Sequence, residues 1–404
     1  MKFPRNFIYV RNKLNLKEEL RSLKNVRSNC LRLFIIVAIE VILLVSTFSI
    51  LTKVVFVGAE SPESPIWWDD AWSFRKAITI DHFKVAGDLV DFPVLIDIVD
   101  ADLAEKAKSN GEDIAFTDIL GNKLSHEIEY YDDSAGRLVA WVKIPFLSST
   151  EDTTLYMYYG NPDAFEQSEP YAVWGSNYVM VEHFEEQSVV YYDSTSFGND
   201  GVVSGGVQGA AGQIDGAASF DGSAGFVSVP HSNVLAGFKS AFTVSLWVKL
   251  DTVSKRQTLL CKYDTSGNQR GWMVEFRPSE KAFAFFASSN GISYSWWYAT
   301  FTPKANTWYY LTIVWESGKI PTFYINGQQT PTTLTGTVTQ IYDNSGTPLN
   351  IGKCTYSTAY NLDGTLDEIR LSNATLTPAY ILTSYNNQNN PSAFYTIGNE
   401  ETNV

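Results

Sequence analysis

The stretch AFTVSLWVKL, residues 241–250, decides the fold. From Phe242 to Val248 every second residue is apolar, and Thr243 and Ser245 stand between them. Successive side chains of a β-strand point to opposite faces, so this period of two predicts a strand with one face in a core. The rest of the region is expected to supply the other strands of that core.

Short runs of the same kind lie on both sides of residues 241–250. They are SFDGSAGFVSVP (219–230), QTLLCKYD (257–264), GWMVEFRP (271–278), TWYYLTIVWESGKIPTFYINGQQ (307–329), LNIGK (349–353) and GTLDEIRLSNATLTPAYI (364–381). A Gly-rich stretch, DSTSFGNDGVVSGGV (193–207), comes before them. The series resembles the laminin-G-like, concanavalin A-like jelly-roll family over about residues 171–398. This resemblance implies two facing antiparallel sheets, one of them concave.

An earlier region, residues 66–165, also predicts short strands with turn signals between them. The candidates are Phe74–Ile80, Phe92–Ile98, Ile114–Thr117, His126–Tyr131, Leu138–Ile144 and Thr154–Tyr159. Only Ala101–Ser109 looks helical. WWDDAWSFRKAITI (67–80), followed by DFPVLIDI, GEDIAFTD, HEIEYYD, VAWVKIPFLS and LYMYYGNP, resembles the domain of unknown function 2341 family. The resemblance implies an extracellular β-sandwich without an agreed activity. We therefore expect an all-β protein of two sandwiches.

Composition and charge narrow the classes of function. The 404 residues are 45% hydrophobic and 14% aromatic, which is typical of a globular protein. Three cysteines exclude a disulfide-built miniprotein, and four histidines leave little room for histidine-based metal sites. Residues 1–58 hold ten of the 30 basic residues and three of the 44 acidic ones, so the rest holds 20 and 41. The phosphates of nucleic acid would repel the acidic remainder of the chain, so we do not expect nucleic-acid binding.

The amino-terminal segment predicts targeting to a membrane. LFIIVAIEVILLVSTFSIL, residues 33–51, carries one charge, Glu40, and is long enough to span a bilayer as a helix. The basic residues 1–32 are expected to stay in the cytoplasm, with the body outside the cell. Residues 33–58 are either a retained single-span signal-anchor or a signal peptide that is cleaved near Ala59. Residues 59–65, with two prolines, form an extended linker.

No catalytic constellation is recognisable in the sequence. A glycosidase needs two carboxyl groups about 5–10 Å apart, and the E-x-D-x-x-E pattern of some jelly-roll glycosidases is missing. Glu127 and Glu129 share one strand face, which we expect to be a solvated face. No histidine lies near a G-x-S-x-G elbow, and each is expected to be a surface or core residue. The other acidic clusters are Glu182, Glu185 and Glu186, and then Asp367 and Glu368; the histidines are His82, His126, His183 and His231.

A structural calcium ion is expected in the second domain, because exported jelly rolls often hold one through carboxylate and carbonyl oxygens. The candidate ligands are Asp193, Asp221 and Asp367, which lie in the family's recurring motifs. For each of them, capping of a turn or of a strand end is the competing interpretation.

A sugar-binding surface is predicted on ISYSWWYAT, residues 292–300. Sugars stack their CH faces on aromatic rings. The period of a strand places Tyr294, Trp296 and Tyr298 on one face and Trp297 on the other. The competing interpretation is that all of these rings pack in the core or between the sheets.

Two cysteines, Cys261 and Cys354, lie on predicted strands of the exported body. An oxidising exterior favours a disulfide between them, which would restrict the unfolded chain.

Together these features predict an extracellular surface protein that binds a glycan or cell-surface polysaccharide without catalysis, in an adhesion-like role. Two alternatives remain open. The sandwiches could serve as a structural envelope scaffold, or the jelly roll could belong to a polysaccharide-degrading enzyme. A fold of this class hosts many functions and does not choose among them.

Overall fold

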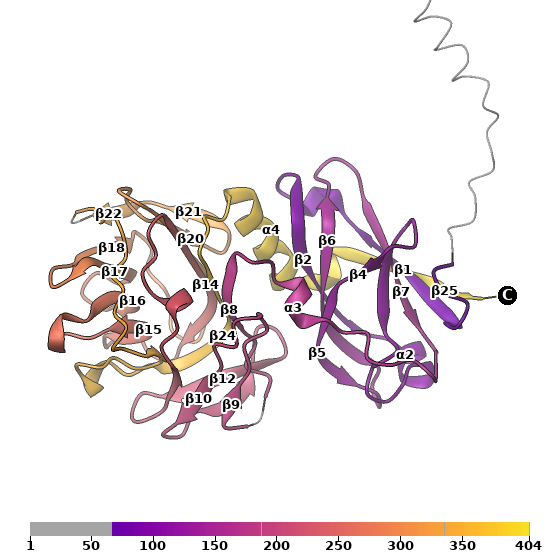
Figure 1. The fold of residues 1–404 in the computed structure, drawn as a ribbon, viewed down its shortest axis with the longest axis horizontal. Helices are drawn as coiled ribbons and strands as arrows, with labels where there is room; N and C mark the ends of the chain where they lie inside the picture. The colour runs from indigo at the N-terminus through magenta and orange to yellow at the C-terminus, as the bar shows by residue number, and fades with distance from the viewer. Residues whose placement is uncertain (1–66, 187, 335, 404) are drawn as a thin grey trace, which may run out of the picture. The chain divides into compact units, whose positions relative to one another are not determined.

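The computed structural model describes residues 67–186, 188–334 and 336–403. All described strands belong to one compact unit, residues 66–404, and all their pairings are antiparallel (Figure 1). Within the described ranges no helix has the length and apolarity needed to cross a bilayer. The predicted cytoplasmic tail, membrane segment and linker, residues 1–65, lie outside these ranges.

The first module is a sandwich of two sheets. One sheet has the order β25-β1-β7-β3-β4 and the other β2-β6-β5. Ile78, Val94, Val142 and Met157 are fully buried between them. Each of the six strands predicted in this region is present, and the helix-like stretch forms α2. The elements are β1 Phe74–Ile80, β2 Leu89–Val99, β3 Ala115–Asp118, β4 Lys123–Leu124, β5 His126–Asp132, β6 Arg137–Leu147, β7 Thr153–Tyr159, η1 His82–Lys84 and α2 Ala101–Lys106.

The second module has a nine-stranded and an eight-stranded sheet. The first has the order β22-β18-β17-β16-β15-β23-β13-β10-β9; the second has β11-β12-β24-β14-β19-β20-β21, with β8 also paired to β24. The strands are β8 Tyr178–Glu182, β9 Val190–Tyr191, β10 Gly201–Ser204, β11 Gln208–Ala211, β12 Gly216–Asp221, β13 Phe226–Val229, β14 Ala241–Leu250, β15 Gln257–Tyr263, β16 Arg270–Arg277, β17 Ala282–Gly291, β18 Ser295–Ala299, β19 Trp308–Glu316, β20 Thr322–Ile325, β21 Gln328–Thr330, β22 Thr332–Leu334, β23 Leu349–Ile351 and β24 Asp363–Ser372.

One apolar core lies between these two sheets and confirms the pattern read from residues 241–250. These residues form β14, and the alternating apolar side chains from Phe242 to Val248 all enter the core. From the facing sheet, Trp272 and Phe285 enter the same core. Short helical segments in the loops are η2 Asn233–Leu235, η3 Ser266–Asn268 and η4 Thr358–Tyr360.

Helix α4 (Pro378–Asn389) contacts both modules (Figure 1). Ile381 packs with Trp247 and Tyr310 on the outer face of the eight-stranded sheet. On the other side, the side-chain amide of Asn387 accepts from the backbone N–H of Leu95 and donates to its carbonyl, at 2.7 and 3.0 Å. The modules therefore share buried contacts. The remaining short helices are α3 Pro170–Val173 and η5 Pro391–Ala393.

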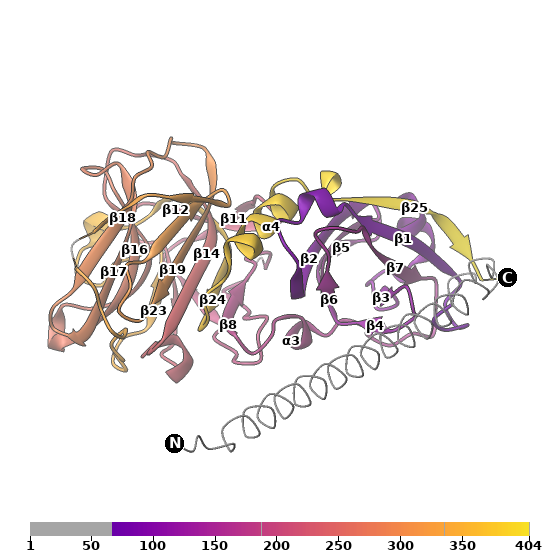
Figure 2. The same ribbon diagram turned by 90° about the horizontal axis from the view of Figure 1, so that it is seen from above.

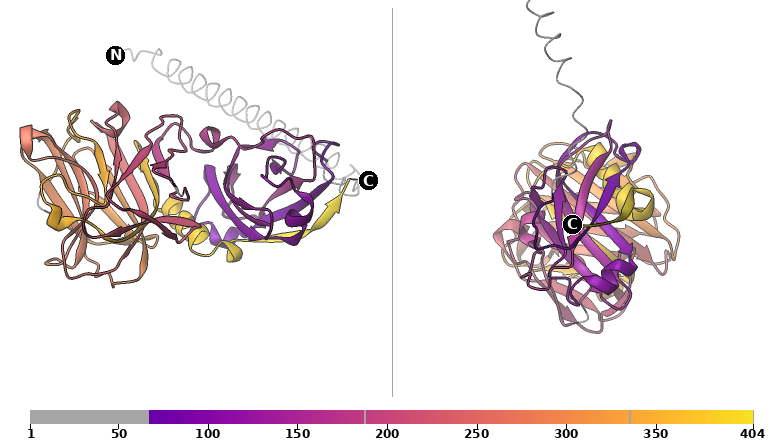
Figure 3. Two further views of the ribbon diagram at one scale, coloured as in Figure 1. Left: turned by 90° about the horizontal axis from the view of Figure 1, so that it is seen from below. Right: turned by 90° about the vertical axis from the view of Figure 1, so that its right-hand side faces the viewer.

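The last strand corrects the predicted extent of the second domain. That domain was expected to run to residue 398, but β25 (Tyr395–Thr402) pairs with β1 in the first module. Figures 2 and 3 show β25 running out along the first module to the carboxyl terminus. Phe394 and Tyr395 enter the first core. Most of β25 is exposed and lacks an apolar period, so its sequence carries no strand signal.

Candidate functional site: an aromatic face on the nine-stranded sheet

The outer face of the nine-stranded sheet is rich in aromatic rings. Strand alternation sends Phe285 and Trp297 into the core and leaves Phe286 and Trp296, which are cross-strand partners, on the outer face. We call the following residues the aromatic face: Tyr263, Phe286, Tyr294, Trp296, Tyr298 and Tyr356.

The three predicted sugar-binding residues lie together on this face. Trp296 stacks on Phe286 at 5.6 Å between ring centroids with planes 9° apart, and on Tyr298 at 5.4 Å. Tyr294 is 51% exposed and stands against Phe286 and Tyr263. Trp297 is fully buried on the other side, as the strand period predicts. The neighbours Phe286 and Tyr263 were not predicted, because they come from other strands.

Arginines lie at the edge of the aromatic face. The guanidinium of Arg277 lies 4.8 Å from the ring centroid of Trp296, a cation–π distance. Arg256 and Arg277 contact the two carboxylate oxygens of the buried Glu275 at 2.7 and 3.1 Å. Burial raises the pKa of Glu275, although both arginines act to lower it. Flat rings beside fixed hydrogen-bond donors are what stacking and hydroxyl recognition of a sugar require.

The three predicted calcium ligands do not form one site. Asp193 accepts four hydrogen bonds, from the N–H groups of Val181, Thr195 and Asn199 and from the Thr195 hydroxyl. Asp221 is exposed and caps its own turn through Ser223. Two acid-and-histidine groups among the described residues have ligand atoms within 4.8 Å of one another, and neither contains these residues.

Asp367 is buried in β24. Its Oδ2 accepts from the N–H groups of Gln213 and Ile214 at 2.8 and 2.9 Å. All three aspartates thus hold loops or strand ends, which is the capping role that competed with calcium ligation in the sequence.

The two cysteines of the predicted disulfide, Cys261 and Cys354, lie close enough for their thiols to interact. Both are buried free thiols, so the predicted disulfide is not formed in this structure. The Cys261 thiol donates to the carbonyl of Tyr263 at 3.3 Å. The interaction between the two thiols lowers the pKa of Cys354 to about 7 and raises that of Cys261. Cys261 lies under the aromatic face, beside Met273 and Phe286.

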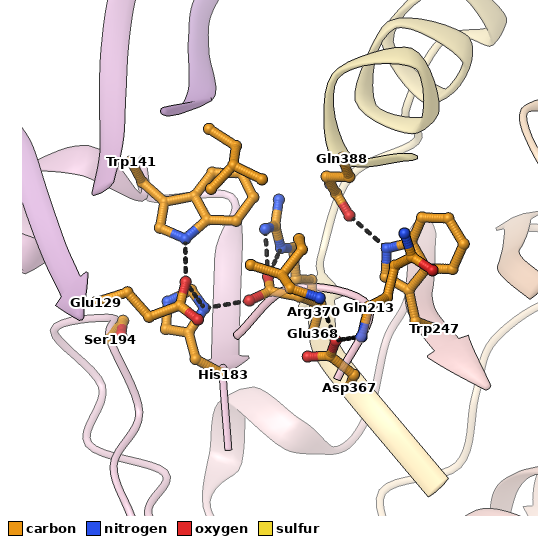
Figure 4. A network of polar contacts seen from close by, with 12 residues as sticks. Glu129, Trp141, His183, Ser194, Gln213, Trp247, Asp367, Glu368, Arg370 and Gln388 are labelled. Carbon is orange, nitrogen blue, oxygen red and sulfur yellow. Dashed lines mark hydrogen bonds and ion pairs between the residues drawn. The ribbon is translucent and has the colours of Figure 1, made fainter. Parts of the chain in front are cut away.

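A buried polar network joins the two modules (Figure 4). His183 Nδ1 lies 2.6 Å from Glu368 Oε1 and 3.5 Å from Glu129 Oε2, and its Nε2 lies 3.4 Å from Glu127 Oε2. Arg370 binds the second oxygen of Glu368. Burial lowers the pKa of His183, but the carboxylates of Glu368 and Glu129 outweigh it and raise the pKa well above its ordinary value.

The network corrects our expectation for Glu127 and Glu129, which are buried rather than on a solvated face. Glu127 accepts from the indole N–H of Trp174 at 2.6 Å, and Glu129 accepts from that of Trp141 at 2.7 Å. Glu129, His183 and Glu368 have metal-ligand spacing, but His183 and the nearby Arg370 already supply positive charge. Glu127, Glu129, His183 and Glu368 thus form an ionic contact between the modules.

Comparison with known families agrees with this architecture. Residues 110–197 match the domain of unknown function DUF2341, and residues 221–382 match the concanavalin A-like lectin/glucanases superfamily. The chain carries both domains, in the predicted order. The first match begins and ends later than the predicted range 66–165. No protein with a curated description matches the chain.

Several solved structures are similar to this chain. The binding domain of Paraclostridial Mosquitocidal Protein 1 is 17% identical with a TM-score of 0.44, and 52% of each chain is covered. The receptor binding domain of botulinum neurotoxin C/D mosaic serotype is 14% identical with a TM-score of 0.43, covering 52% of this chain and 51% of that one. The chain thus spans about half the length of these structures.

A further similar structure is domain 4 of AbnA, a GH43 extracellular arabinanase from Geobacillus stearothermophilus, in complex with arabinotriose. It is 18% identical with a TM-score of 0.39, and the match covers 52% of this chain and 98% of that domain. Similarity at this level does not show what this chain binds.

Proposed function

We propose that the protein binds a glycan without catalysis, through the aromatic face of its concanavalin A-like domain. The observation that carries the proposal is the stack of Phe286, Trp296 and Tyr298 on an outer sheet face, with Arg277 against it. The outer edges of the stacked rings, together with the exposed Tyr294, offer an apolar surface for the CH groups of a sugar. Guanidinium N–H groups suit its hydroxyl oxygens.

We place this binding at the outside of the cell, in an adhesion-like role. The basic residues 1–32 and the apolar residues 33–51 support that placement, as does the acidic body that follows them. The ligand class is a cell-surface or nutrient polysaccharide. The buried partners of Glu127 and Glu129 support a role without catalysis, since both carboxylates are engaged by indole N–H groups.

The test is binding of the full-length chain, in mild detergent, to a broad glycan panel. We expect saturable binding that Trp296→Ala weakens at least about tenfold, the loss typical of a central aromatic contact. Trp308→Ala is the matched control, because Trp308 lies on the other sheet and has the ammonium of Lys249 4.8 Å from its ring centroid. A flat panel, or equal losses in both variants, would exclude the proposal and favour an envelope scaffold.

A further inference from the structure

Arg270, at the start of β16, differs from the other arginines that the structure describes. Among the described residues no carboxylate forms an ion pair with it, although the chain has 44 acidic and only 30 basic residues. The other arginines of the described ranges all form such pairs; they are Arg75, Arg137, Arg256, Arg277 and Arg370. An acidic protein therefore leaves one guanidinium without a counter-ion.

The guanidinium of Arg270 also makes few hydrogen bonds. Its Nη1 donates to the carbonyl of Gly291 at 3.4 Å, which is a long contact. Its Nε is buried and has no hydrogen-bond partner in the described part of the chain. An arginine carries five N–H donors, and the strong acceptor that suits them is a carboxylate. The side chain is partly exposed, so a ligand can contact it.

Arg270 lies beside the most exposed ring of the aromatic face. Burial raises the pKa of Tyr263 to about 12, and the nearby charge of Arg270 acts to lower it. The ring centroid of Tyr263 lies 6.2 Å from that of Tyr294, which is 51% exposed. Gly291, which accepts from Arg270, comes three residues before Tyr294. An exposed ring and an unpaired positive charge thus border the same part of the face.

The loop that leads to Tyr294 is fixed by local contacts. The side-chain oxygen of Asn290 accepts from the N–H groups two and three residues ahead, at 2.9 and 3.0 Å. Gly291 has a φ of 77°, and a Cβ atom there would lie 2.1 Å from the carbonyl oxygen of Asn268. Only glycine permits so close an approach of the two loops. A loop that is ordered before the ligand arrives lowers the entropic cost of binding.

We propose that the aromatic face binds an acidic glycan, with a sugar carboxylate on Arg270 and a sugar ring stacked on Tyr294. This inference rests on the proposed glycan binding and names the class of its ligand. The planar fork of a guanidinium matches a carboxylate, and charge-assisted bonds are stronger than bonds to neutral hydroxyls. Arg256 and Arg277 contribute less, because both already form ion pairs with glutamates.

The test compares acidic oligosaccharides with the same compounds after carboxyl reduction, which turns each acidic sugar into a neutral one. The probes are oligogalacturonate, hyaluronan oligosaccharides and sialyllactose, and calorimetry measures their affinity for the full-length chain in mild detergent. Salt at about 0.15 M screens long-range attraction. We expect at least one acidic probe to bind at least about tenfold more tightly than its reduced form.

The deciding variant is Arg270→Gln. Its affinity for the acidic probe should fall at least about tenfold, while its affinity for the reduced probe should change less than about twofold. Arg270→Lys keeps the charge without the fork and should keep part of the preference. Lys249→Gln is the matched control, because it removes one positive charge from the other sheet, where the ammonium lies 4.8 Å from the ring centroid of Trp308. It should bind both probes as the wild type does.

Equal affinity of the wild type for acidic and reduced probes would overturn the inference, and this comparison does not depend on whether a variant folds. An unchanged preference in a folded Arg270→Gln would overturn it as well, as would tighter binding to sulfated carrageenan oligosaccharides than to every carboxylate probe. Binding to neutral glycans alone would overturn only this inference. A chain that binds no glycan at all would overturn the proposed function together with it.

Discussion

The guanidinium of Arg370 packs against two indole rings from separate segments of the chain. Its central carbon is 4.1 Å from the ring centroid of Trp141 and 4.5 Å from that of Trp174. It also binds the carboxylate of Glu368, which holds His183 on its other oxygen. The sequence predicted a strand over GTLDEIR, but not this contact, because both indoles are distant in sequence.

We predict that Arg370→Met lowers the free energy of unfolding by about 3 kcal/mol, because it leaves Glu368 buried with half of its positive partners. Adding Glu368→Gln should restore part of the loss. Urea unfolding of the single and double variants should give a coupling energy of at least about 1 kcal/mol. Strictly additive losses would show that the pair acts through packing alone.

Strand β5 shows what periodicity can and cannot predict. HEIEYYD was correctly predicted as a strand with Glu127 and Glu129 on one face. An alternating acidic face has the same sequence pattern whether it faces water or packs against another module. Its partner His183 lies far along the chain, so the pattern does not reveal the contact. By contrast, residues 241–250 could be interpreted fully, because apolar alternation has one common cause, a core.

The first residue of β5, His126, should make the first module sensitive to acid. Burial lowers its pKa to about 4, whereas an unfolded histidine titrates near 6.5. Between these pH values the unfolded chain binds more protons, so stability falls as pH falls, by about 3 kcal/mol in total. His126→Gln should remove this part of the decline between about pH 7 and about pH 4 in urea titrations. An unchanged decline would locate the acid sensitivity in other groups.

At the scale of the whole molecule, the order of the two domains was predictable and their fusion was not. The order of the domains followed from the two family resemblances, because each series of motifs lies within one region of the sequence. The fusion depends on α4, β25 and a third apolar cluster, in which Leu95 and Trp141 of the first module pack with Val181 and Ile214 of the second. The contacts between the modules join residues 40 or more positions apart, which share no local pattern.

The aromatic face was also only partly predictable from the sequence. The alternation within one strand predicted that Tyr294, Trp296 and Tyr298 share a face. The positions of Phe286 and Arg277 beside them depend on the order of β16, β17 and β18 in the sheet, which the sequence pattern does not show. Glu182, Glu185 and Glu186 were visible in the sequence only as an acidic cluster. The burial of Glu182 could not be predicted, because its carboxylate lies against Gly201 at the start of β10.

The most direct test of glycan binding is fluorine NMR of the full chain with 5-fluorotryptophan at its 11 tryptophans, titrated with the best glycan of the panel. Trp296→Phe and Trp308→Phe assign the two resonances of interest by their loss. We predict that the Trp296 resonance shifts saturably with the affinity found in the panel while that of Trp308 stays in place. A glycan that saturates the protein without moving the Trp296 resonance would contradict binding at the aromatic face.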